Sequence, residues 1–377
     1  MKKVIHIVEN LDKGAVEMWL VRMFLICVKK NPEIEWTFYC ILSRRGRLDD
    51  QVIAAGGKII YSPYELSQKW SFLLYLRQTL KRGNYDIIHS HHDYLSGLYL
   101  ITTIGLRLNQ KILHIHNTDE ELPMGNVYVK RILLVLAKQL ALRINDTIIG
   151  VSDEALNFFL KNTGSKRITN QVIYCGISME PFFRKLNKTE KKEGLGFSKE
   201  DKILLFVGRM NKVKNPVFVV DILKEVLKTD INYHAVFIGN GDEYESVKRR
   251  AIELNILNNI HLFGWRDDIH EMMQIADAFV FPRLENPKEA LGLVVIEAQA
   301  SGLPVFISKG ILQEAIIFPE NVHYIDNILE PKSWSDEILR FKIGDIQYES
   351  NSFKKNLLNS VFEENNAAFN LIQLYEK

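Results

Sequence analysis

The chain has 377 residues, of which 47% are apolar and 25% charged, and this length suits two domains of roughly 150 residues better than one core. Forty-eight Lys and Arg against 46 Asp and Glu give a net charge of +2, which offers no support for nucleic-acid binding. No apolar run approaches the ~20 residues of a transmembrane helix. The N-terminal apolar stretch is too short for a signal peptide, and three scattered cysteines suit a reducing compartment, so we expect a cytoplasmic protein.

Short β-rich apolar runs alternate with helical patterns through the first half of the chain. The runs are expected to be strands because they are short and rich in β-branched residues, whereas the segments between them space their apolar residues as a helix does. Strands are expected at 4–8, 37–42, 86–89, 111–116 and 147–151, and helices at 16–30, 67–82 and 127–143. Helices between successive strands imply crossover connections and therefore a parallel sheet.

The same alternation restarts after residue 200. Strands are expected at 202–207, 234–238, 260–263, 278–281 and 304–307, with a helix at 217–227. The basic, loop-like composition of 184–201 is typical of a surface linker whose charges are solvated. The expected organisation is an N-terminal domain at 1–178, a linker at 179–200, a C-terminal domain at 201–352 and a final helical segment at 353–377.

Three loops after expected strands are candidates for an anionic ligand, because ligands of open α/β sheets lie beyond the carboxyl ends of the strands. The first contains Gly14, which either lets the backbone approach a ligand or only makes a turn. The second, 208–216, carries Arg209 and Lys214 into a helix; the two cations suit phosphate, and a solvated basic turn is the alternative. The third, 239–242, has Gly-x-Gly without the third glycine of a dinucleotide fingerprint.

The most informative segment opens at Glu289 and continues into an apolar helix with a glycine stop. Glu297 lies about two turns further on, where a carboxylate is costly unless it is paired or faces a ligand. Free amides at the start of this helix favour a pyrophosphate, and the two glutamates can accept hydrogen bonds from sugar hydroxyls on either side of it. The amides concerned are those of Gly292, Leu293 and Val294.

These segments are joined by several others into an ordered set of motifs. In chain order the set is Gly14 with Glu17, Tyr85–His92, His114–Asn117, Gly150–Ser152, Gly208–Arg209 with Lys214, Gly239–Gly241, Phe263–Asp268, Glu289–Glu297 and Gly302–Pro304. It resembles the retaining glycosyltransferases of family 4, above all bacterial capsule and exopolysaccharide enzymes, over nearly the whole chain. The resemblance implies the GT-B fold: two Rossmann-like, doubly wound parallel-sheet α/β domains that face each other across a cleft, with the last helix returning to the N-terminal domain.

The resemblance also implies roles in the C-terminal domain. Arg209 and Lys214 would hold the donor diphosphate and stabilise its charge as it leaves. Glu289 would contact donor-sugar hydroxyls and Glu297 the ribose. The loop of Gly241 would lie near a phosphate or sugar, and the backbone near Trp265 and Arg266 would meet the base.

In the N-terminal domain, Gly14 would lie against the donor phosphates and His116 beside the reacting sugar, where it helps to orient donor and acceptor. The implied reaction retains the anomeric configuration, and the leaving phosphate takes the acceptor proton. The protein then contributes positioning and electrostatic stabilisation. No metal and no other cofactor is expected, because Arg and Lys replace the cation that other transferases use.

The chain departs from the family pattern at several positions, which leaves the donor sugar open. Ala15 and Ala290 stand where glycine is common, and Arg283 stands where a serine is usual. Cys175 replaces a familiar asparagine, and the stretch 284–288 is longer than usual.

Two other features have competing interpretations. A metal site is suggested by the histidines at strand ends, His89, His91, His92, His114 and His116, together with Asp93. No carboxylate is spaced with the histidines in a known ligand pattern, which favours a cleft lining or local hydrogen bonds. The basic and aromatic segment 69–77 and the helix from 127 suit either a membrane interface or ordinary packing with solvated charges.

We therefore expect an enzyme that moves a sugar from a nucleotide-sugar donor, with UDP as the nucleotide that the family implies. The acceptor would be a glycan or a lipid-linked precursor in surface polysaccharide biosynthesis, with peripheral contact at the inner face of the plasma membrane as one option. Two rivals share the fold: a non-catalytic subunit that regulates a partner transferase, and a nucleotide-sugar epimerase. The altered glycines motivate the first rival, and the retention of all four charged residues argues against it.

Overall fold

The computed structural model describes residues 1–12, 14–118, 127–161, 169–326, 330–341 and 351–377. The chain forms two compact units. The first comprises Met1–Gly176 and returns for Glu364–Lys377, and the second comprises Ile177–Glu363.

The first unit is a seven-stranded parallel sheet with the order β3-β2-β1-β4-β5-β6-β7. Its strands are β1 (Lys2–Val8), β2 (Ile34–Cys40), β3 (Lys58–Tyr61), β4 (Ile87–Ser90), β5 (Gln110–Ile115), β6 (Thr147–Gly150) and β7 (Thr169–Val172). Its α-helices are α1 (Ala15–Lys30), α2 (Asp49–Ala54), α3 (Lys69–Gly83), α4 (Ser96–Tyr99), α5 (Val127–Ile144), α6 (Asp153–Leu160) and α14 (Glu364–Glu376). The order reverses between β1 and β4, which makes the loops after these strands the expected ligand edge of the sheet.

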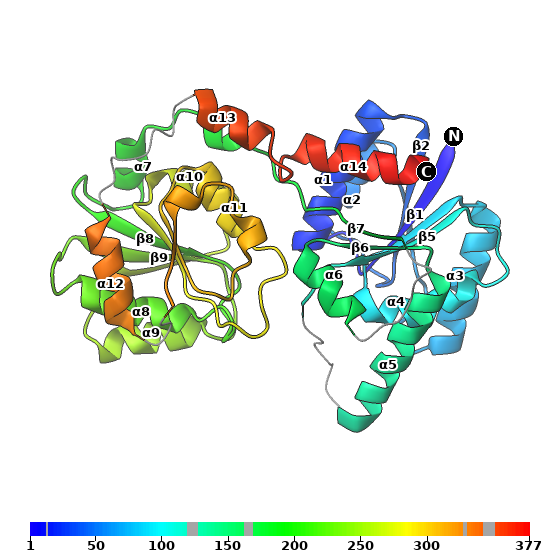
Figure 1. The fold of residues 1–377 in the computed structure, drawn as a ribbon, viewed down its shortest axis with the longest axis horizontal. Helices are drawn as coiled ribbons and strands as arrows, with labels where there is room; N and C mark the ends of the chain where they lie inside the picture. The colour runs from blue at the N-terminus through cyan, green and yellow to red at the C-terminus, as the bar shows by residue number, and fades with distance from the viewer. Residues whose placement is uncertain (13, 119–126, 162–168, 327–329, 342–350) are drawn as a thin grey trace. The chain divides into compact units, whose positions relative to one another are not determined.

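The helices of the first unit cover both faces of the sheet. Figure 1 shows α1, α2 and α14 on one face and α3, α4 and α5 on the other. The short 3₁₀ turns η1 (Asp93–Leu95) and η2 (Leu100–Thr103) flank α4 and pack with it on α5. Alternate residues of β1 therefore enter different layers: Ile5 and Ile7 pack toward α3, and His6 packs toward α1 and α14.

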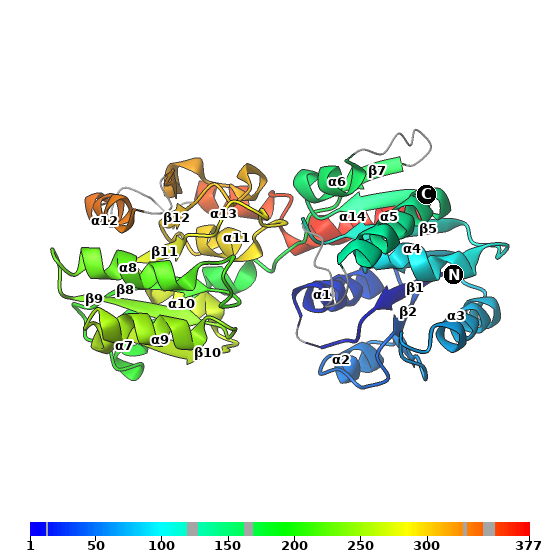
Figure 2. The same cartoon turned by 90° about the horizontal axis from the view of Figure 1, so that it is seen from below.

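The second unit repeats the doubly wound plan with six parallel strands in the order β10-β9-β8-β11-β12-β13. Its strands are β8 (Lys202–Val207), β9 (Tyr233–Ile238), β10 (Ile260–Gly264), β11 (Ala278–Phe281), β12 (Val305–Ile307) and β13 (Val322–Tyr324). Its α-helices are α7 (Lys188–Gly194), α8 (Pro216–Val226), α9 (Tyr244–Glu253), α10 (Ile269–Ile275), α11 (Leu293–Ala300), α12 (Pro331–Arg340) and α13 (Asn351–Leu358). Figure 2 shows this arrangement from below. The α/β fold class expected from the sequence is confirmed.

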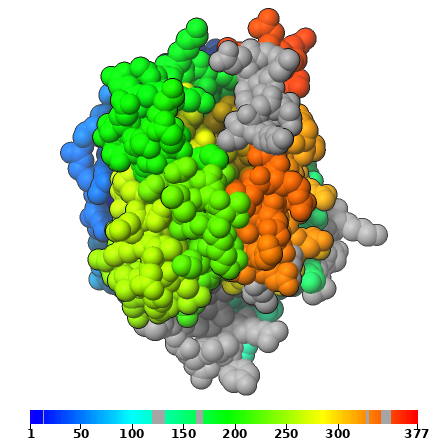
Figure 3. Space-filling model, turned by 90° about the vertical axis from the view of Figure 1, so that its left-hand side faces the viewer, coloured from blue at the N-terminus to red at the C-terminus, as the bar shows by residue number. Residues whose placement is uncertain are grey.

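The helices of the second unit follow their apolar spacing. Pro216 occupies the first turn of α8, where a missing N–H costs nothing, and the apolar residues of α8 are buried against the sheet. Trp334 of α12 is fully buried and packs edge-on against Phe218 of α8, with 6.1 Å between the ring centroids. In the space-filling view, α12 (orange) and α8–α9 (green to yellow-green) form neighbouring parts of one surface (Figure 3).

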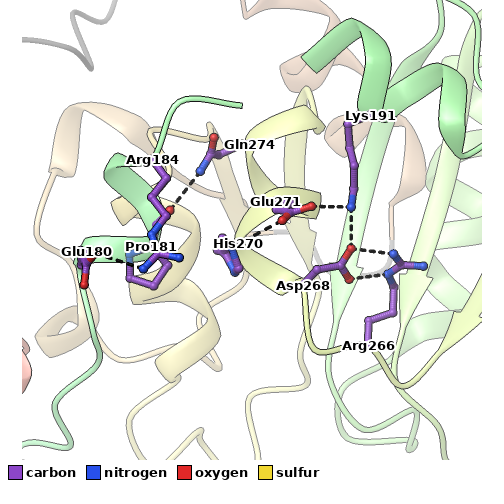
Figure 4. A network of polar contacts seen from close by, with 9 residues as sticks. All are labelled: Glu180, Pro181, Arg184, Lys191, Arg266, Asp268, His270, Glu271 and Gln274. Atoms are coloured by element: carbon purple, nitrogen blue, oxygen red, sulfur yellow. Dashed lines mark hydrogen bonds and ion pairs between the residues drawn. The ribbon is translucent and has the colours of Figure 1, made fainter. Parts of the chain in front are cut away.

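The segment expected as a linker belongs structurally to the second unit. It forms α7, and Lys191 of this helix forms ion pairs with Asp268, 2.7 Å away, and with Glu271 of α10 (Figure 4). Gln274 of α10 also donates a hydrogen bond to the carbonyl of Pro181, at 3.3 Å. The basic composition predicted solvated charges, but at Lys191 the carboxylates of α10 take the place of solvent.

The C-terminal segment differs from a single helix packed on the N-terminal domain. It breaks into α13, which belongs to the second unit, and α14, which belongs to the first. Between them the carbonyl of Phe362 accepts a hydrogen bond from the amide of Ile177, at 2.8 Å. Only α14 packs on α1, with Asn31 bonded to Glu376 at 2.9 Å and Arg22 paired with Glu364 at 3.7 Å.

Among the residues that the structure describes, no helix is both long and apolar enough to span a bilayer.

Candidate functional site

The loop after β8 places Lys214 just before the first turn of α8. Its backbone amide donates to the side-chain oxygen of Asn211 at 3.0 Å, which closes the loop on itself. The ammonium group is held 5.3 Å from the centre of the Phe281 ring of β11, a cation–π distance. Arg209, in the same loop, is exposed. Both cations therefore lie at the carboxyl end of β8, where an α/β sheet binds its ligand.

A carboxylate and a further arginine complete a charged cluster around Lys214. Glu289 lies 3.8 Å from the Lys214 ammonium and 3.2 Å from Nε of Arg283. Arg283, whose side chain is 7% exposed, also donates to the carbonyl of Pro287 at 2.6 Å. The motif order predicts Arg209, Lys214 and Glu289 as site residues, whereas Arg283 stands out in the sequence only as a departure from the family pattern. That departure is itself a signal, since a buried arginine requires an anionic partner.

Electrostatics in the cluster favour an incoming anion. Desolvation by burial lowers the pKa of Lys214, the nearby charges of Arg283 and Arg209 lower it further, and Glu289 opposes them. Lys214 and Arg283 therefore share the Glu289 carboxylate, and the charge of Arg209 adds to the positive charge around Lys214. A diphosphate would balance this positive charge through forked contacts to arginine and point-charge contacts to lysine.

The glycines of the second unit's loops are required by close backbone contact. A Cβ atom on Gly239 would lie 2.1 Å from the carbonyl oxygen of Gly208, and one on Gly241 would lie 2.3 Å from that of Met210. The amide of Met210 donates to the carbonyl of Asn240 at 2.9 Å, so the two loops are joined by backbone bonds. Gly241, predicted to be near the donor, has at least this structural role.

Replacing Gly239 by alanine should therefore destabilise the second unit by about 2 kcal/mol or more, because its φ of 126° and the neighbouring carbonyl both reject a side chain. Chemical denaturation measures the loss. Gly194, at the end of α7, is the matched control, because the position that an added methyl group would take has no other atom within 4 Å. Gly194→Ala should be neutral or slightly stabilising. Equal stabilities of the two variants would refute the packing argument.

The helix after Glu289 has the expected layout. Gly292 precedes α11, and the first amide that finds a backbone acceptor in this turn is that of Val295, which donates to the carbonyl of Gly292 at 2.8 Å. The preceding amides, at Leu293 and Val294, have no acceptor within the helix and so can bind an anion. Glu297 is half-buried on the second turn of α11.

The predicted base-contacting residues lie after β10, and one of them is already engaged. Arg266 makes a two-pronged bond to Asp268, with Nε–Oδ1 and Nη2–Oδ2 distances of 2.7 and 2.6 Å, and Lys191 shares the same carboxylate (Figure 4). Together the two cations hold the pKa of Asp268 far below its usual range. The Trp265 side chain is 58% exposed. The Arg266 guanidinium is engaged by Asp268, and contact between the backbone of this loop and a base stays a prediction.

In the first unit, Gly14 caps α1, but its surroundings differ from a vacant anion site. A Cβ atom on Gly14 would lie 2.0 Å from Oε2 of Glu17, so the carboxylate of Glu17 covers this glycine. Desolvation raises the pKa of Glu17, and a hydrogen bond from its own backbone amide opposes that rise. An anion that approached Gly14 would first have to displace this carboxylate.

His116 follows β5 in the first unit and belongs to a buried histidine cluster, defined as His6, His89, His91, His114 and His116. All five are less than 9% exposed. The backbone amide of His116 donates to Asp93 at 2.7 Å, and its ring Nε2 lies 3.1 Å from Nδ1 of His91. Burial lowers the pKa of His116 to about 3, so the ring is neutral near pH 7 and can exchange hydrogen bonds but not act as a cationic acid.

The histidine cluster has the distances of a metal site but not the ring geometry of one. Two triads, His6–His89–His91 and His91–His114–His116, each bring three nitrogens within 4.8 Å of one another. A bound ion must lie in the plane of every ligand ring, because the nitrogen lone pair lies in that plane. In the first triad the rings of His89 and His91 are instead stacked at 4.3 Å with 28° between their planes, and in the second the rings of His114 and His116 lie 4.3 Å apart with 33° between their planes. Hydrogen bonding fits this arrangement better than coordination.

Comparison with known proteins agrees with this architecture. The family model "Glycosyl transferases group 1" matches residues 187–351 and "Glycosyltransferase Family 4" matches residues 35–180. The "Capsular polysaccharide biosynthesis glycosyltransferase CapH" of Staphylococcus aureus is 26% identical over 90% of this chain and 90% of its own length. The "UDP-Gal:alpha-D-GlcNAc-diphosphoundecaprenol alpha-1,3-galactosyltransferase" of Escherichia coli is 26% identical over 76% of this chain and 70% of its own.

Among solved structures, Anabaena Alr3699/HepE in complex with UDP-glucose superposes with a TM-score of 0.75 at 16% identity, covering 100% of both chains. This likeness establishes the GT-B fold. The two matched segments lie in different units and together span most of the sequence. The chain therefore belongs to the group 1 glycosyltransferases of family 4.

Proposed function

We propose that this chain transfers a sugar from a nucleotide-sugar donor, with retention of configuration and without a metal ion. The pairing of Lys214 and Arg283 with Glu289, with the charge of Arg209 acting on Lys214, is the observation that carries the proposal. The cations and the first amides of α11 would hold the diphosphate and stabilise the charge that develops as it leaves. Glu289, once released from the cations by the diphosphate, would accept hydrogen bonds from the sugar.

The remaining predicted residues would complete the donor site. Glu297 would hold the ribose, and the backbone beside Trp265 and Arg266 would contact the base. From the first unit, Gly14 would approach the donor phosphates after Glu17 moves, and His116 would orient the reacting sugar.

We propose a UDP-sugar as donor and a lipid-linked glycan precursor of surface polysaccharide as acceptor. Two relatives support this proposal: one acts with UDP-Gal on a diphosphoundecaprenol-linked sugar, and another belongs to capsular polysaccharide biosynthesis. The structural relative holds UDP-glucose.

Two measurements test the proposal together. Calorimetric titration with UDP should give a saturable heat, and radiolabelled UDP-sugars incubated with lipid-linked acceptors should give a labelled glycolipid. Binding without transfer to any acceptor, and without donor hydrolysis, would favour the regulatory subunit; sugar interconversion without acceptor would favour the epimerase. Absence of binding across a panel of nucleotide sugars would refute the donor site itself.

The side of the first unit that carries α3 and α5 is suited to an anionic bilayer. α3 and α5 each contain four Lys or Arg residues and no Asp or Glu, although the whole chain is almost neutral. Large apolar side chains are exposed on the same side: Trp70, Leu74, Ile104, Ile132, Leu133, Val135 and Leu136. η2 packs on both helices and joins them into one layer.

Exposed apolar residues among cations are typical of membrane interfaces. We propose that this layer docks on the inner face of the plasma membrane, where a lipid-linked acceptor is held.

Removing two of these side chains should weaken the binding. Ile132→Ser with Leu136→Ser removes aliphatic groups that are 63% and 52% exposed on α5, and should reduce co-sedimentation with phosphatidylglycerol vesicles by about tenfold or more, given roughly 1.5–3 kcal/mol per buried side chain. Ile231→Ser changes a residue of the second unit that is 78% exposed and should leave binding unchanged. Equal vesicle binding by the double variant and by Ile231→Ser would contradict the docking surface.

A further inference from the structure

A chain of imidazole contacts crosses the buried face of the first sheet and ends at His116. Nδ1 of His6 lies 3.1 Å from Nε2 of His91, and Nδ1 of His91 lies 3.1 Å from Nε2 of His116. Both nitrogens of His91 are therefore occupied by neighbouring histidines. At the far end, Nε2 of His6 lies 3.5 Å from the hydroxyl of Tyr375 in α14, which is 2.7 Å from Nδ1 of His89.

Strand pairing and packing fix the rings in place. His6 of β1 is the register partner of His89 of β4, so both side chains enter the layer between the sheet and α1. The His6 ring is stacked on Trp36 with 4.4 Å between centroids and 7° between planes. Trp19 of α1 packs edge-on against His91 and His116. With the rings so confined, their nitrogens cannot turn to other partners without repacking the layer.

The neutral state couples the protons along the chain. Burial lowers the pKa of His6 to about 3 and that of His91 well below its usual value, so each ring carries a single N–H. If Nδ1 of His91 donates to His116, then Nε2 of His91 has no proton and must accept from His6. In the reverse arrangement Nε2 of His116 donates to His91 and Nε2 of His91 donates to His6, so all three rings change tautomer together. The tautomer of His116 is therefore coupled to that of His6, two contacts away.

We propose that His6 and His91 are positioning residues for His116, holding its ring in one orientation and one tautomer so that Nδ1, the nitrogen that the chain does not use, serves a substrate hydroxyl group. The kinetic part of this inference rests on the proposed sugar transfer; the tautomer coupling does not. A histidine whose Nδ1 alternates between donor and acceptor would lose a hydrogen bond in part of its population. A fixed tautomer avoids that loss.

The principal test uses the ¹⁵N chemical shifts of the histidine rings, which distinguish the two neutral tautomers. In the wild-type protein at pH 7.5, His116 should show one tautomer. His6→Phe keeps an aromatic ring on Trp36 but removes the contact to His91, so His91 and His116 should show mixed or shifted tautomers. His6→Asn places an amide near the former Nδ1 position and should restore the single state.

Kinetics provide the second readout. His6→Phe should lower kcat by about tenfold with little change in the donor KM, since the chain orients a group rather than binding the nucleotide. His6→Asn should recover most of the rate. Tyr39→Phe removes a buried hydroxyl from the opposite face of the same sheet, where Tyr39 contacts Phe72, and should change neither readout.

Several outcomes would overturn the inference. Two interconverting tautomers of His116 in the wild-type protein would do so even if His6→Phe failed to fold. An unchanged His116 signal in a folded His6→Phe protein would do so as well. One equivalent of bound zinc in the purified protein, lost with His91→Asn, would make these nitrogens ligands instead. If tautomer coupling is present but no sugar is transferred to any acceptor, the proposed function fails and the coupling stands.

Discussion

Lys214→Ala is expected to lower kcat/KM for the nucleotide sugar by more than tenfold, with the fold intact. Lys214 is the central cation of the cluster, 3.8 Å from Glu289 and close enough to Arg283 and Arg209 for their charges to lower its pKa. Removal of one preorganised donor from an enzyme's oxyanion site costs on the order of 2.7–4 kcal/mol of transition-state stabilisation. Loss of one preorganised charge beside a leaving diphosphate should have an effect of the same kind. Most of the loss should appear in kcat, because the charge on the diphosphate grows as the sugar departs.

The matched control for this substitution lies in the same loop. Lys212 is exposed, two residues away, and Lys212→Ala should leave kcat/KM within about twofold because an exposed cation contributes little. Steady-state rates with circular dichroism spectra of both variants give the measurement. A normal rate in Lys214→Ala, or an equal loss in Lys212→Ala, would show that the diphosphate is held elsewhere.

Much of the fold could be predicted from the sequence because its signals are local. β8 and β11 have the expected bounds, since both are short, predominantly apolar runs next to turn residues. The edge strand β7 could not be predicted in this way: its sequence, Thr-Asn-Gln-Val, has no apolar alternation, and its pairing with β6 makes it a strand. Helix α7 could not be predicted either, since its composition is that of a linker. The ion pairs that Lys191 of this helix makes with Asp268 and Glu271 involve residues far away in the sequence.

The candidate site divides in the same way. Motif order predicts Arg209, Lys214 and Glu289; the structure pairs Lys214 with Glu289 and leaves Arg209 exposed, close enough for its charge to lower the pKa of Lys214. Arg283 joins the cluster because the loop after β11 returns it to Glu289, a contact that no spacing rule indicates. Glu17 is recognisable in the sequence only as part of a motif, and its position over Gly14 depends on the side-chain conformation at the start of α1.

The five histidines of the buried cluster have a consequence for acid stability that the sequence alone did not suggest. Burial lowers the pKa of every ring in the cluster, to about 3 for His6 and His116. In the unfolded chain the rings titrate near 6.5, so below that pH the unfolded state binds protons that the folded state excludes. The stability is fully present above pH 6.5 and is lost as the pH falls toward the folded-state values.

The first unit should therefore unfold in mild acid. Each ring that stays neutral in the folded state lowers the free energy of unfolding by about 1.4 kcal/mol between pH 8 and 5.5, so five such rings remove roughly 7 kcal/mol over that range. A typical domain has only about 5–15 kcal/mol of stability, and loss of cooperative structure near pH 5.5 is the expected result. Scanning calorimetry between pH 8 and 5 should show the transition of the first unit falling steeply with pH.

His114→Leu should make this dependence shallower. His114 is fully buried, and neither of its ring nitrogens has a hydrogen-bond partner among the described residues, so the substitution removes a titrating group without breaking a bond. Relative to the wild-type protein, the variant should gain about 1.4 kcal/mol at pH 5.5 compared with pH 8. Ile112→Val changes a buried, non-titrating residue of the same strand and should cost the same at both values. A parallel loss of stability in the wild-type protein and His114→Leu between pH 8 and 5.5 would contradict this prediction. The ring of His114 would then take up its proton in the folded state, and the cluster would not be the neutral, dry layer that its burial indicates.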